Sequence, residues 1–273
     1  MTSNGLYITQ LLASKNGSTE TECEDAAQVI PTAAFDELVD APLAVGMADG
    51  ATESLLAKDW AQILARSAAQ HAWEDEQILQ GGAAFEDFAL STVSLWEPWL
   101  EKYTAERATR ENPLKWYEHA KLSAGASATL LMVRMDPVPE GGWLWRCAAL
   151  GDSCLFHIRD GEILRSFPVE EADEFGVTPD LFNSLNRNST LIAARTMFTE
   201  GVCEAGDRLL LMTDALAHWF LSATDHGSAL GELSEFSGPH DAYRFTEWLR
   251  RLRSEGVLHN DDVAVVRVDI EGR

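Results

Sequence analysis

The residues with the clearest chemical potential are carboxylates that stand at the ends of apolar stretches. Asp49 follows the run VGMA, Asp152 follows AALG, and Asp214 follows LLLMT. Asp261 opens the run DDVAVVRV, and the pair Glu24–Asp25 stands in a polar segment near the N-terminus. Taken singly, each is explained as a turn residue or a helix N-cap, since Asp is favoured at both. Together they predict one shared site, provided that the fold brings the strand ends to the same place.

Converging carboxylates would need a compensating partner. Two carboxylates about 4 Å apart repel by roughly 4 kcal/mol at an effective dielectric constant near 20. Proteins relieve such repulsion by protonation or by bound cations. A ligand set made of oxygen atoms, without His or Cys, selects hard ions such as Mg²⁺, Mn²⁺ or Ca²⁺. Two such ions can activate a water near neutral pH and hold a phosphoryl oxygen.

The composition argues against two classes of binding partner. The 273 residues include 44 acidic and 21 basic residues, which gives a net charge of −23. Nucleic acids and anionic membranes bind through clusters of Lys and Arg, so neither is expected as a partner. The four cysteines form no C-x-x-C pair, and neither a signal peptide nor a membrane span is evident. We therefore expect a cytoplasmic protein. The excess of acidic residues suits cation binding, but acidic proteins are commonly just soluble, and the sequence leaves the oligomeric state open.

The elements that must position these acids are predicted from periodicity. Apolar, β-branched runs predict strands at 5–15, 41–49, 125–135, 141–153, 207–214 and 261–270. The segment 154–167 predicts a hairpin with its turn at Asp160–Gly161. Helical spacing predicts a helix beginning after Thr52 as N-cap, a second over 85–103 that kinks or restarts at Pro98, and a third over 239–253.

Strands in runs and helices in pairs indicate an α+β fold rather than alternating βαβ units. We find neither an internal repeat nor a linker that would divide the chain, so residues 1–273 are expected to form a single domain. The stretch 166–205 shows no sustained periodicity. It is therefore either a functional excursion or irregular structure packed on the body.

The motifs, taken in order, resemble those of the 2C-type metal-dependent protein phosphatases (PPM family), and the chain is similar to a divergent, bacterial-like member. CEDA resembles the N-E-D-A element, VGMADGA the V-x-D-G-x strand end, and GASATLLMV the G-S-T-A strand. AALGDSCLFHIRDGEI matches the G-D-S-R-x-x-x-x-R-x-G region, DRLLLMTDAL resembles G-D-x-L-L-L-x-T-D-G-L, and NDDVAVVRV resembles D-N-x-T-V-V-V-V. Six motifs in order, over nearly the whole chain, carry the resemblance.

The resemblance implies a four-layer α-β-β-α sandwich and a site that binds two Mn²⁺ or Mg²⁺ ions, with room for a third. Asp49 would bridge two metals and the Gly50 carbonyl would bind one of them. Asp214 and Asp261 would hold the first metal, Glu24 or Asp25 the second, and Asp152 the third. A metal-activated water would attack the phosphorus of a phosphoserine or phosphothreonine in a phosphorylated protein. Residues 166–205 would correspond to the variable flap.

The sequence also departs from the family pattern. Where many members carry an Arg that grips the substrate phosphate, this chain has Glu20, and Lys15 is the nearest upstream cation. The Arg after G-D-S is replaced by Cys154, and the D-N pair by Asp261–Asp262. Three functions stay open: a phosphoprotein phosphatase, a catalytically weak or inactive domain that serves as a regulatory or binding module, and a phosphatase of small phosphate esters. His259, close to Asp261, is a candidate general acid, but a surface role is favoured.

Overall fold

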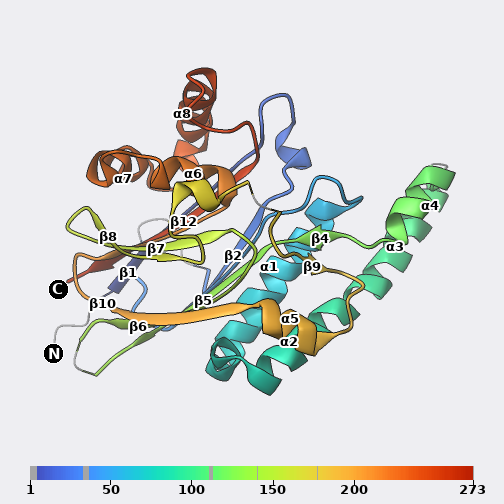
Figure 1. Ribbon diagram of the computed structural model, residues 1–273, viewed down its shortest axis with the longest axis horizontal. Helices are drawn as coiled ribbons and strands as arrows, with labels where there is room; N and C mark the ends of the chain where they lie inside the picture. Colours follow the sequence, from blue (N-terminus) through green and yellow to red (C-terminus); the bar gives the residue numbers. More distant parts are fainter. Residues whose placement is uncertain (1–4, 33–36, 111–112, 140, 177, 273) are drawn as a thin grey trace.

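Two five-stranded antiparallel sheets form the centre of the molecule (Figure 1). The computed structural model describes residues 5–32, 37–110, 113–139, 141–176 and 178–272. The first sheet has the order β1 (Gly5–Ala13), β12 (Val263–Glu271), β11 (Arg208–Met212), β7 (Cys154–Arg159), β8 (Glu162–Phe167). The second has the order β10 (Met197–Cys203), β6 (Trp143–Leu150), β5 (Leu130–Pro137), β3 (Leu43–Ala48), β2 (Ala26–Ile30). A two-stranded sheet pairs β4 (Ser127–Ala128) with β9 (Phe182–Asn183).

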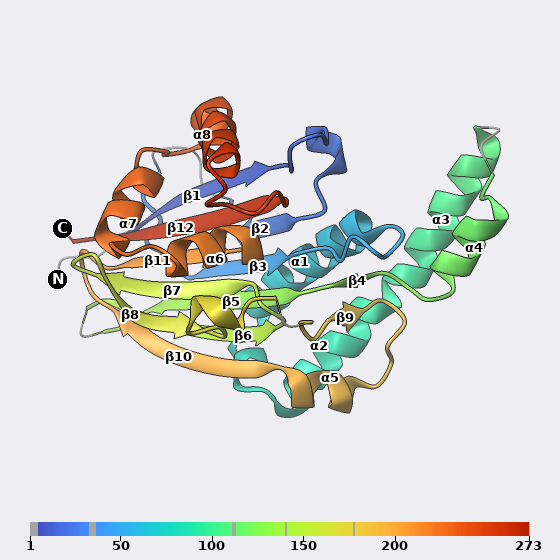
Figure 2. The same ribbon diagram turned by 45° about the horizontal axis from the view of Figure 1, so that its top comes forward.

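Helices cover the outer face of each sheet. The second sheet carries α1 (Ala57–Glu74) and α2 (Gly82–Ser94), with α5 (Ser189–Arg195) packed beside α2. The first sheet carries α6 (Asp214–Leu221), α7 (His226–Ser234) and α8 (Ala242–Ser254). Two further helices, α3 (Trp96–Thr109) and α4 (Trp116–Leu122), extend away from the sheets (Figure 2). No helix in the described ranges is both long and apolar enough to cross a membrane.

Three apolar clusters fill the spaces between these layers. One lies between the two sheets and includes Leu43, Trp145 and Val266. The other two lie between each sheet and its helices. The predicted α+β fold and four-layer sandwich are therefore confirmed.

The contact between β3 and α1 shows how sequence sets the spacing of two layers. Alanines recur along the buried face of α1, so its backbone can approach the sheet closely. Gly46 lies opposite on β3, and a Cβ atom there would stand 2.1 Å from the Ala65 carbonyl oxygen. Only glycine fits this position. The close approach fixes β3, whose last residue directly precedes Asp49.

Most predicted elements are present at their expected places. The hairpin turns at Asp160 and Gly161, which both have positive φ values (53° and 83°), as the favoured two-residue turn requires. The expected interruption near Pro98 falls at Leu95, where α2 ends and α3 begins. Pro98 thus lies in the first turn of α3, where backbone N–H groups lack intrahelical partners and proline is tolerated.

The predicted N-cap of the first helix was wrong. The helix begins at Ala57, and its N-cap is Leu56 in a left-handed conformation (φ 66°). Residues 51–56 form turns instead, and the Thr52 hydroxyl donates a hydrogen bond to Glu24 (2.7 Å). The hydrogen bond to Glu24, a residue distant in sequence, therefore holds Thr52 outside the helix.

The stretch 166–205 contains more regular structure than its sequence indicates. It holds β9, α5 and β10, and β10 pairs with β6 as the edge strand of the second sheet. Its partly exposed, irregular burial pattern explains why the strand has no clear alternation. Whether the rest of the stretch acts as a flap stays a prediction.

Candidate metal-binding active site

The ends of several strands meet at one cavity of about 540 Å³ at one end of the sandwich. Asp49 and Gly50 enter it from the end of β3, Asp152 from the end of β6, and Asp214 from the end of β11. Asp261 enters it from the segment before β12. Five of the predicted site residues therefore share a single cavity.

Asp49 and Gly50 are held by backbone pairing with the segment around β4. The Asp49 carbonyl accepts from the Thr129 amide (2.8 Å), and the Asp49 amide donates to the Thr129 hydroxyl (3.1 Å). Gly50 forms a β-bridge with Ala128. A Cβ at Gly50 would lie 2.8 Å from the Glu24 carbonyl oxygen, so only glycine fits here. These contacts fix the direction in which the Asp49 carboxylate leaves the sheet.

Asp152 owes its position to the tight turn after β6. Gly151 has φ 106°, and a Cβ there would lie 2.7 Å from the Thr129 side chain. The Thr129 hydroxyl also bonds the Ser153 hydroxyl (2.8 Å). Thr129 thus supports the residues on both sides of the cavity, from Asp49 to Asp152.

Asp214 is at once the end of a strand and the first residue of a helix. The preceding Thr213 is the N-cap of α6, and its amide donates to the Ala264 carbonyl (3.1 Å). The Ala264 amide donates in return to the Thr213 hydroxyl (2.9 Å). The end of β11 is therefore tied to the start of β12, which places Asp214 beside Asp261.

The two adjacent aspartates before β12 have different surroundings. Asp261 lines the cavity, and its side chain is half exposed (50%). Asp262 is buried and accepts hydrogen bonds from the amides of Lys15 and Glu24, each at 2.7 Å. Asp262 therefore anchors the segment after β1, while Asp261 is free to face a ligand.

The pair Glu24–Asp25 also separates. Asp25 is 3% exposed, and its Oδ2 atom is buried without a hydrogen-bond partner. The Glu24 carboxylate instead accepts from the Thr52 hydroxyl and pairs with the Lys15 ammonium (3.2 Å). Asp25 is the member of the pair that lies within the acidic group.

Lys15 brings a positive charge to the rim of this group. Its Nζ atom lies 3.2 Å from Glu24, 3.7 Å from Asp261 and 3.3 Å from the Thr52 hydroxyl. Burial works against the charged ammonium, but the bond to Glu24 and the charge of Asp261 prevail, and the pKa of Lys15 is raised. Glu20, at the position of the family's Arg, is exposed and lies in the short 3₁₀ helix Glu20–Glu22.

The electrostatics show that the carboxylates strongly disfavour one another's charge. Burial raises the pKa of Asp49 well above its usual range, and the charges of Asp25, Asp214 and Asp152 add to the effect. Burial and then Asp214 raise the pKa of Asp152 to about 6. Burial likewise raises the pKa of Asp25 and of Asp214. Without cations, each of these carboxyl groups therefore holds its proton more tightly than an exposed carboxyl group does.

These residues fit a site for hard divalent cations. The donors are carboxylates and one backbone carbonyl, and Asp25 Oδ2 is a buried oxygen that lacks a partner. The group is open rather than tightly closed: among described residues, no three of its carboxylates have oxygens all within 4.8 Å of one another.

Part of the 166–205 stretch borders the same cavity. Gly176, Thr178, Pro179 and Leu181 line it opposite the strand ends. On the other side, the exposed ring of His259 stacks on His218, with centroids 4.8 Å apart.

Sequence reasoning missed four residues of this region. Ser127 and Thr129 line the cavity, Thr52 was assigned to a helix cap, and Asp262 was read only as a replaced Asn. The motif GASATLLMV contained the signal for Ser127 and Thr129, because small hydroxyl residues interrupt an apolar strand there. Nothing local identified Thr52, whose partners come from elsewhere in the chain.

Comparison with known proteins supports the fold. No protein-family model matches the chain, and no curated protein matches it by sequence. Solved structures do match. The serine/threonine phosphatase of S. agalactiae is 14% identical, with a TM-score of 0.58, over 97% of this chain and 100% of that one. The catalytic domain of the serine/threonine protein phosphatase PstP, in complex with two manganese ions, is 18% identical, with a TM-score of 0.50, over 98% and 99%.

RsbX in complex with magnesium is 12% identical, with a TM-score of 0.51, over 99% of this chain and 100% of that one. The chain therefore has the fold of the 2C-type (PP2C) phosphatase domains, as the motifs predicted. The alignments span nearly the whole length of this chain and of each of these structures.

Proposed function

We propose that this chain is a Mn²⁺- or Mg²⁺-dependent phosphatase that hydrolyses phosphoserine and phosphothreonine in proteins. The observation that carries the proposal is the cavity in which Asp49, Asp152, Asp214 and Asp261 meet, with Asp25 buried beside them. A protein that served only as a scaffold would gain nothing from this repulsion. The 2C-type fold and the metal complexes of PstP and RsbX support the same conclusion.

The residues of the cavity would have the following roles. Asp214 and Asp261 would hold a first ion and Asp25 a second; Asp49 would serve both and the Gly50 carbonyl one of them, while Asp152 would hold a weaker third. The bound ions would supply Lewis acidity and lower the pKa of a water. Lys15, held at the rim by Glu24 and Thr52, would take the phosphate-orienting role of the absent Arg. Ser127 and Thr129 would hold the aspartates of the cavity in position.

The test is hydrolysis of a phosphothreonine peptide with Mn²⁺, with EDTA, and with the variant Asp214→Asn. We expect activity that needs Mn²⁺ and falls at least a hundredfold in the variant, because one ligand of the first ion is weakened. The asparagine side-chain oxygen can still accept the hydrogen bond that the Ala215 amide donates to Asp214 Oδ1, so folding, checked by circular dichroism, should be retained. Mn²⁺ binding without hydrolysis of any phosphopeptide would contradict the proposal and support a binding module. Hydrolysis restricted to small esters would instead indicate a small-molecule substrate.

A further inference from the structure

A second group of metal-ligand residues lies at the opposite end of β11 from Asp214. His157 comes from β7, Cys203 from the end of β10, and Asp207 from the turn before β11. All three are buried, and their ligand atoms lie within 4.8 Å of one another. In the part of the chain that the structure describes, no other three His, Cys, Asp or Glu residues are gathered this closely.

We propose that His157, Cys203 and Asp207 supply three protein ligands to a Zn²⁺ ion. Tetrahedral zinc with Zn–S near 2.3 Å and Zn–N near 2.05 Å places sulfur and nitrogen about 3.5 Å apart. Cys203 Sγ lies 3.5 Å from His157 Nε2. The Nε2 atom lies 2.8 Å from Asp207 Oδ2, a hydrogen-bond distance. Zinc would replace the shared proton and widen that gap by about half an ångström.

The neighbouring groups already hold the carboxylate in position. Arg159 donates from Nε to Asp207 Oδ1 (2.7 Å) and from Nη2 to Oδ2 (2.8 Å). The Glu204 amide also donates to Oδ2 (2.8 Å). Such outer contacts orient ligands in metal sites. The edge-on Trp145 ring packs against the His157 ring, with centroids 5.9 Å apart, and limits its rotation.

The chemistry of the donors separates this group from the acidic cavity. One thiolate, one imidazole and one carboxylate suit Zn²⁺, whereas the all-oxygen cavity suits Mg²⁺ or Mn²⁺. The location also gives the ion a role. His157 belongs to the first sheet and Cys203 to the second, so an ion here would join the two sheets far from the cavity. Three protein ligands leave one tetrahedral position for water.

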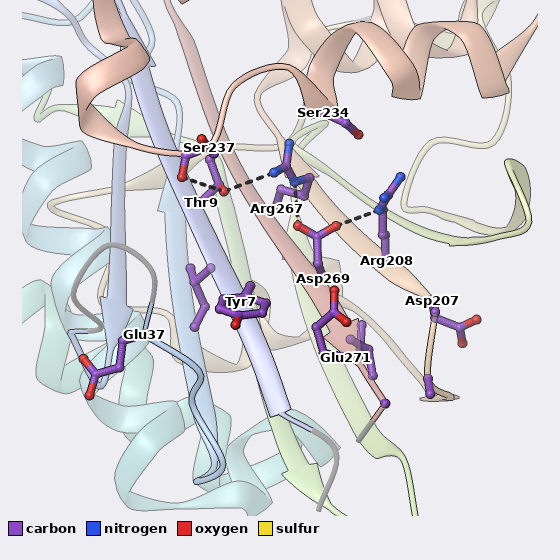
Figure 3. Close-up of a pocket in the computed structure, with 15 residues that line it drawn as sticks. Tyr7, Thr9, Glu37, Asp207, Arg208, Ser234, Ser237, Arg267, Asp269 and Glu271 are labelled. Atoms are coloured by element: carbon purple, nitrogen blue, oxygen red, sulfur yellow. Dashed lines mark hydrogen bonds and ion pairs between the residues drawn. The ribbon is translucent and has the colours of Figure 1, made fainter.

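The site is distinct from the large cavity beside it, which has a volume of about 610 Å³. Asp207 stands at the margin of that cavity, with its carboxylate turned away from Arg267 and Asp269 (Figure 3). Asp269 pairs with Arg267 (2.8 Å) and with Arg208 (2.7 Å). The charge of Asp269 is thus neutralised by the two arginines, and Asp207 directs its oxygens to His157 and Arg159.

The experiment is cobalt substitution in the full-length protein. The protein is stripped with a chelator and titrated with Co²⁺ while its absorption spectrum is recorded. With excess Mg²⁺ present to occupy the acidic cavity, we expect a thiolate-to-cobalt charge-transfer band that saturates at one equivalent, together with visible bands typical of tetrahedral coordination. Zinc content after purification, measured by mass spectrometry, should be close to one equivalent per chain.

Two variants give the controls. Cys203→Ser should lose the charge-transfer band, whereas Cys147→Ser, at an equally buried cysteine of β6, should keep it. The wild-type spectrum decides the matter even if Cys203→Ser fails to fold. Asp214→Asn should keep the band, since the acidic cavity holds no sulfur. A wild-type spectrum without the band, or zinc content equal to that of Cys203→Ser, would overturn the proposal and leave only a hydrogen-bonded network.

Discussion

The ionised carboxylates of the metal-free cavity should lower the protein's free energy of unfolding. The variant Asp152→Asn measures the contribution of one of them. The pKa of Asp152 is raised from 3.8 to about 6 by burial and by Asp214. The folded state therefore holds its proton more tightly than the unfolded state, so stability falls as pH rises through this window. At pH values above the folded-state pKa the full loss of stability is present. At pH values below the ordinary pKa of 3.8 this loss vanishes.

The magnitude follows from the two pKa values. A difference of about 2 units corresponds to about 3 kcal/mol at about pH 7.5, because each unit is worth 1.36 kcal/mol. At about pH 4.5 only about 1 kcal/mol remains, since the folded group is then protonated. Asparagine keeps the shape of the side chain and removes the charge. In EDTA, the variant should therefore unfold with a free energy up to about 3 kcal/mol higher than the wild type at about pH 7.5.

The assay is urea unfolding, followed by tryptophan fluorescence, at both pH values. Asp262→Asn is the matched control, because its carboxylate accepts hydrogen bonds from two backbone amides and is not among the residues that line the cavity. It should destabilise the protein by about 2 kcal/mol, since one charge-assisted hydrogen bond is lost. Asp152→Asn is thus expected to raise the free energy of unfolding, and Asp262→Asn to lower it.

Millimolar Mn²⁺ adds a second readout. Ions that bind only the folded state stabilise it by about 2.7 kcal/mol at a hundred times Kd. Asp152→Asn should keep most of this gain, because Asp49, Asp214 and Asp261 are intact. If Asp152→Asn destabilises the metal-free protein at about pH 7.5, or if its effect does not shrink at about pH 4.5, the reasoning about mutual repulsion is refuted.

Three further outcomes are expected. Gly46→Ala should lower the free energy of unfolding by about 3 kcal/mol in chemical denaturation, since its Cβ would lie 2.1 Å from the Ala65 carbonyl oxygen; an unchanged midpoint would show that α1 can shift. Thr129→Val should cost about 2 kcal/mol in the same assay, because the Asp49 amide loses its acceptor, and a neutral result would mean that water replaces it. Lys15→Met should reduce kcat/KM on a phosphopeptide about tenfold while Lys15→Arg retains it, and equal values for both would remove Lys15 from phosphate binding.

Much of the fold follows from the sequence because its strands are strongly patterned. The runs that end at Asp49 and Asp214 are buried on both sides, so they are almost continuously apolar. The hairpin at Asp160–Gly161 is specified by local turn chemistry. By contrast, β10 is an edge strand with mixed exposure, and its pairing with β6 depends on contacts distant in sequence.

The candidate site was predictable in its members but not in their arrangement. Periodicity shows that an acid ends a strand; it does not show which strand ends meet. The resemblance to a known fold supplied that information, and the structure places four of the aspartates on one cavity. Thr52 shows the limit of local reasoning, because its sequence context suits a helix cap while Glu24 and Lys15 bind it elsewhere.

The adjacent pair Asp261–Asp262 shows why composition alone cannot assign ligands. Neither residue belongs to β12, which begins at Val263, and Asp261 lies in a bend, so strand alternation does not decide which of the two acids faces the cavity. Asp262 turns inward, where the amides of Lys15 and Glu24 bind its two oxygens. That leaves Asp261 facing the cavity, beside Asp214. The groups that bind Asp262 come from residues 15 and 24, so the division of roles between the two acids is a property of the tertiary structure rather than of the motif.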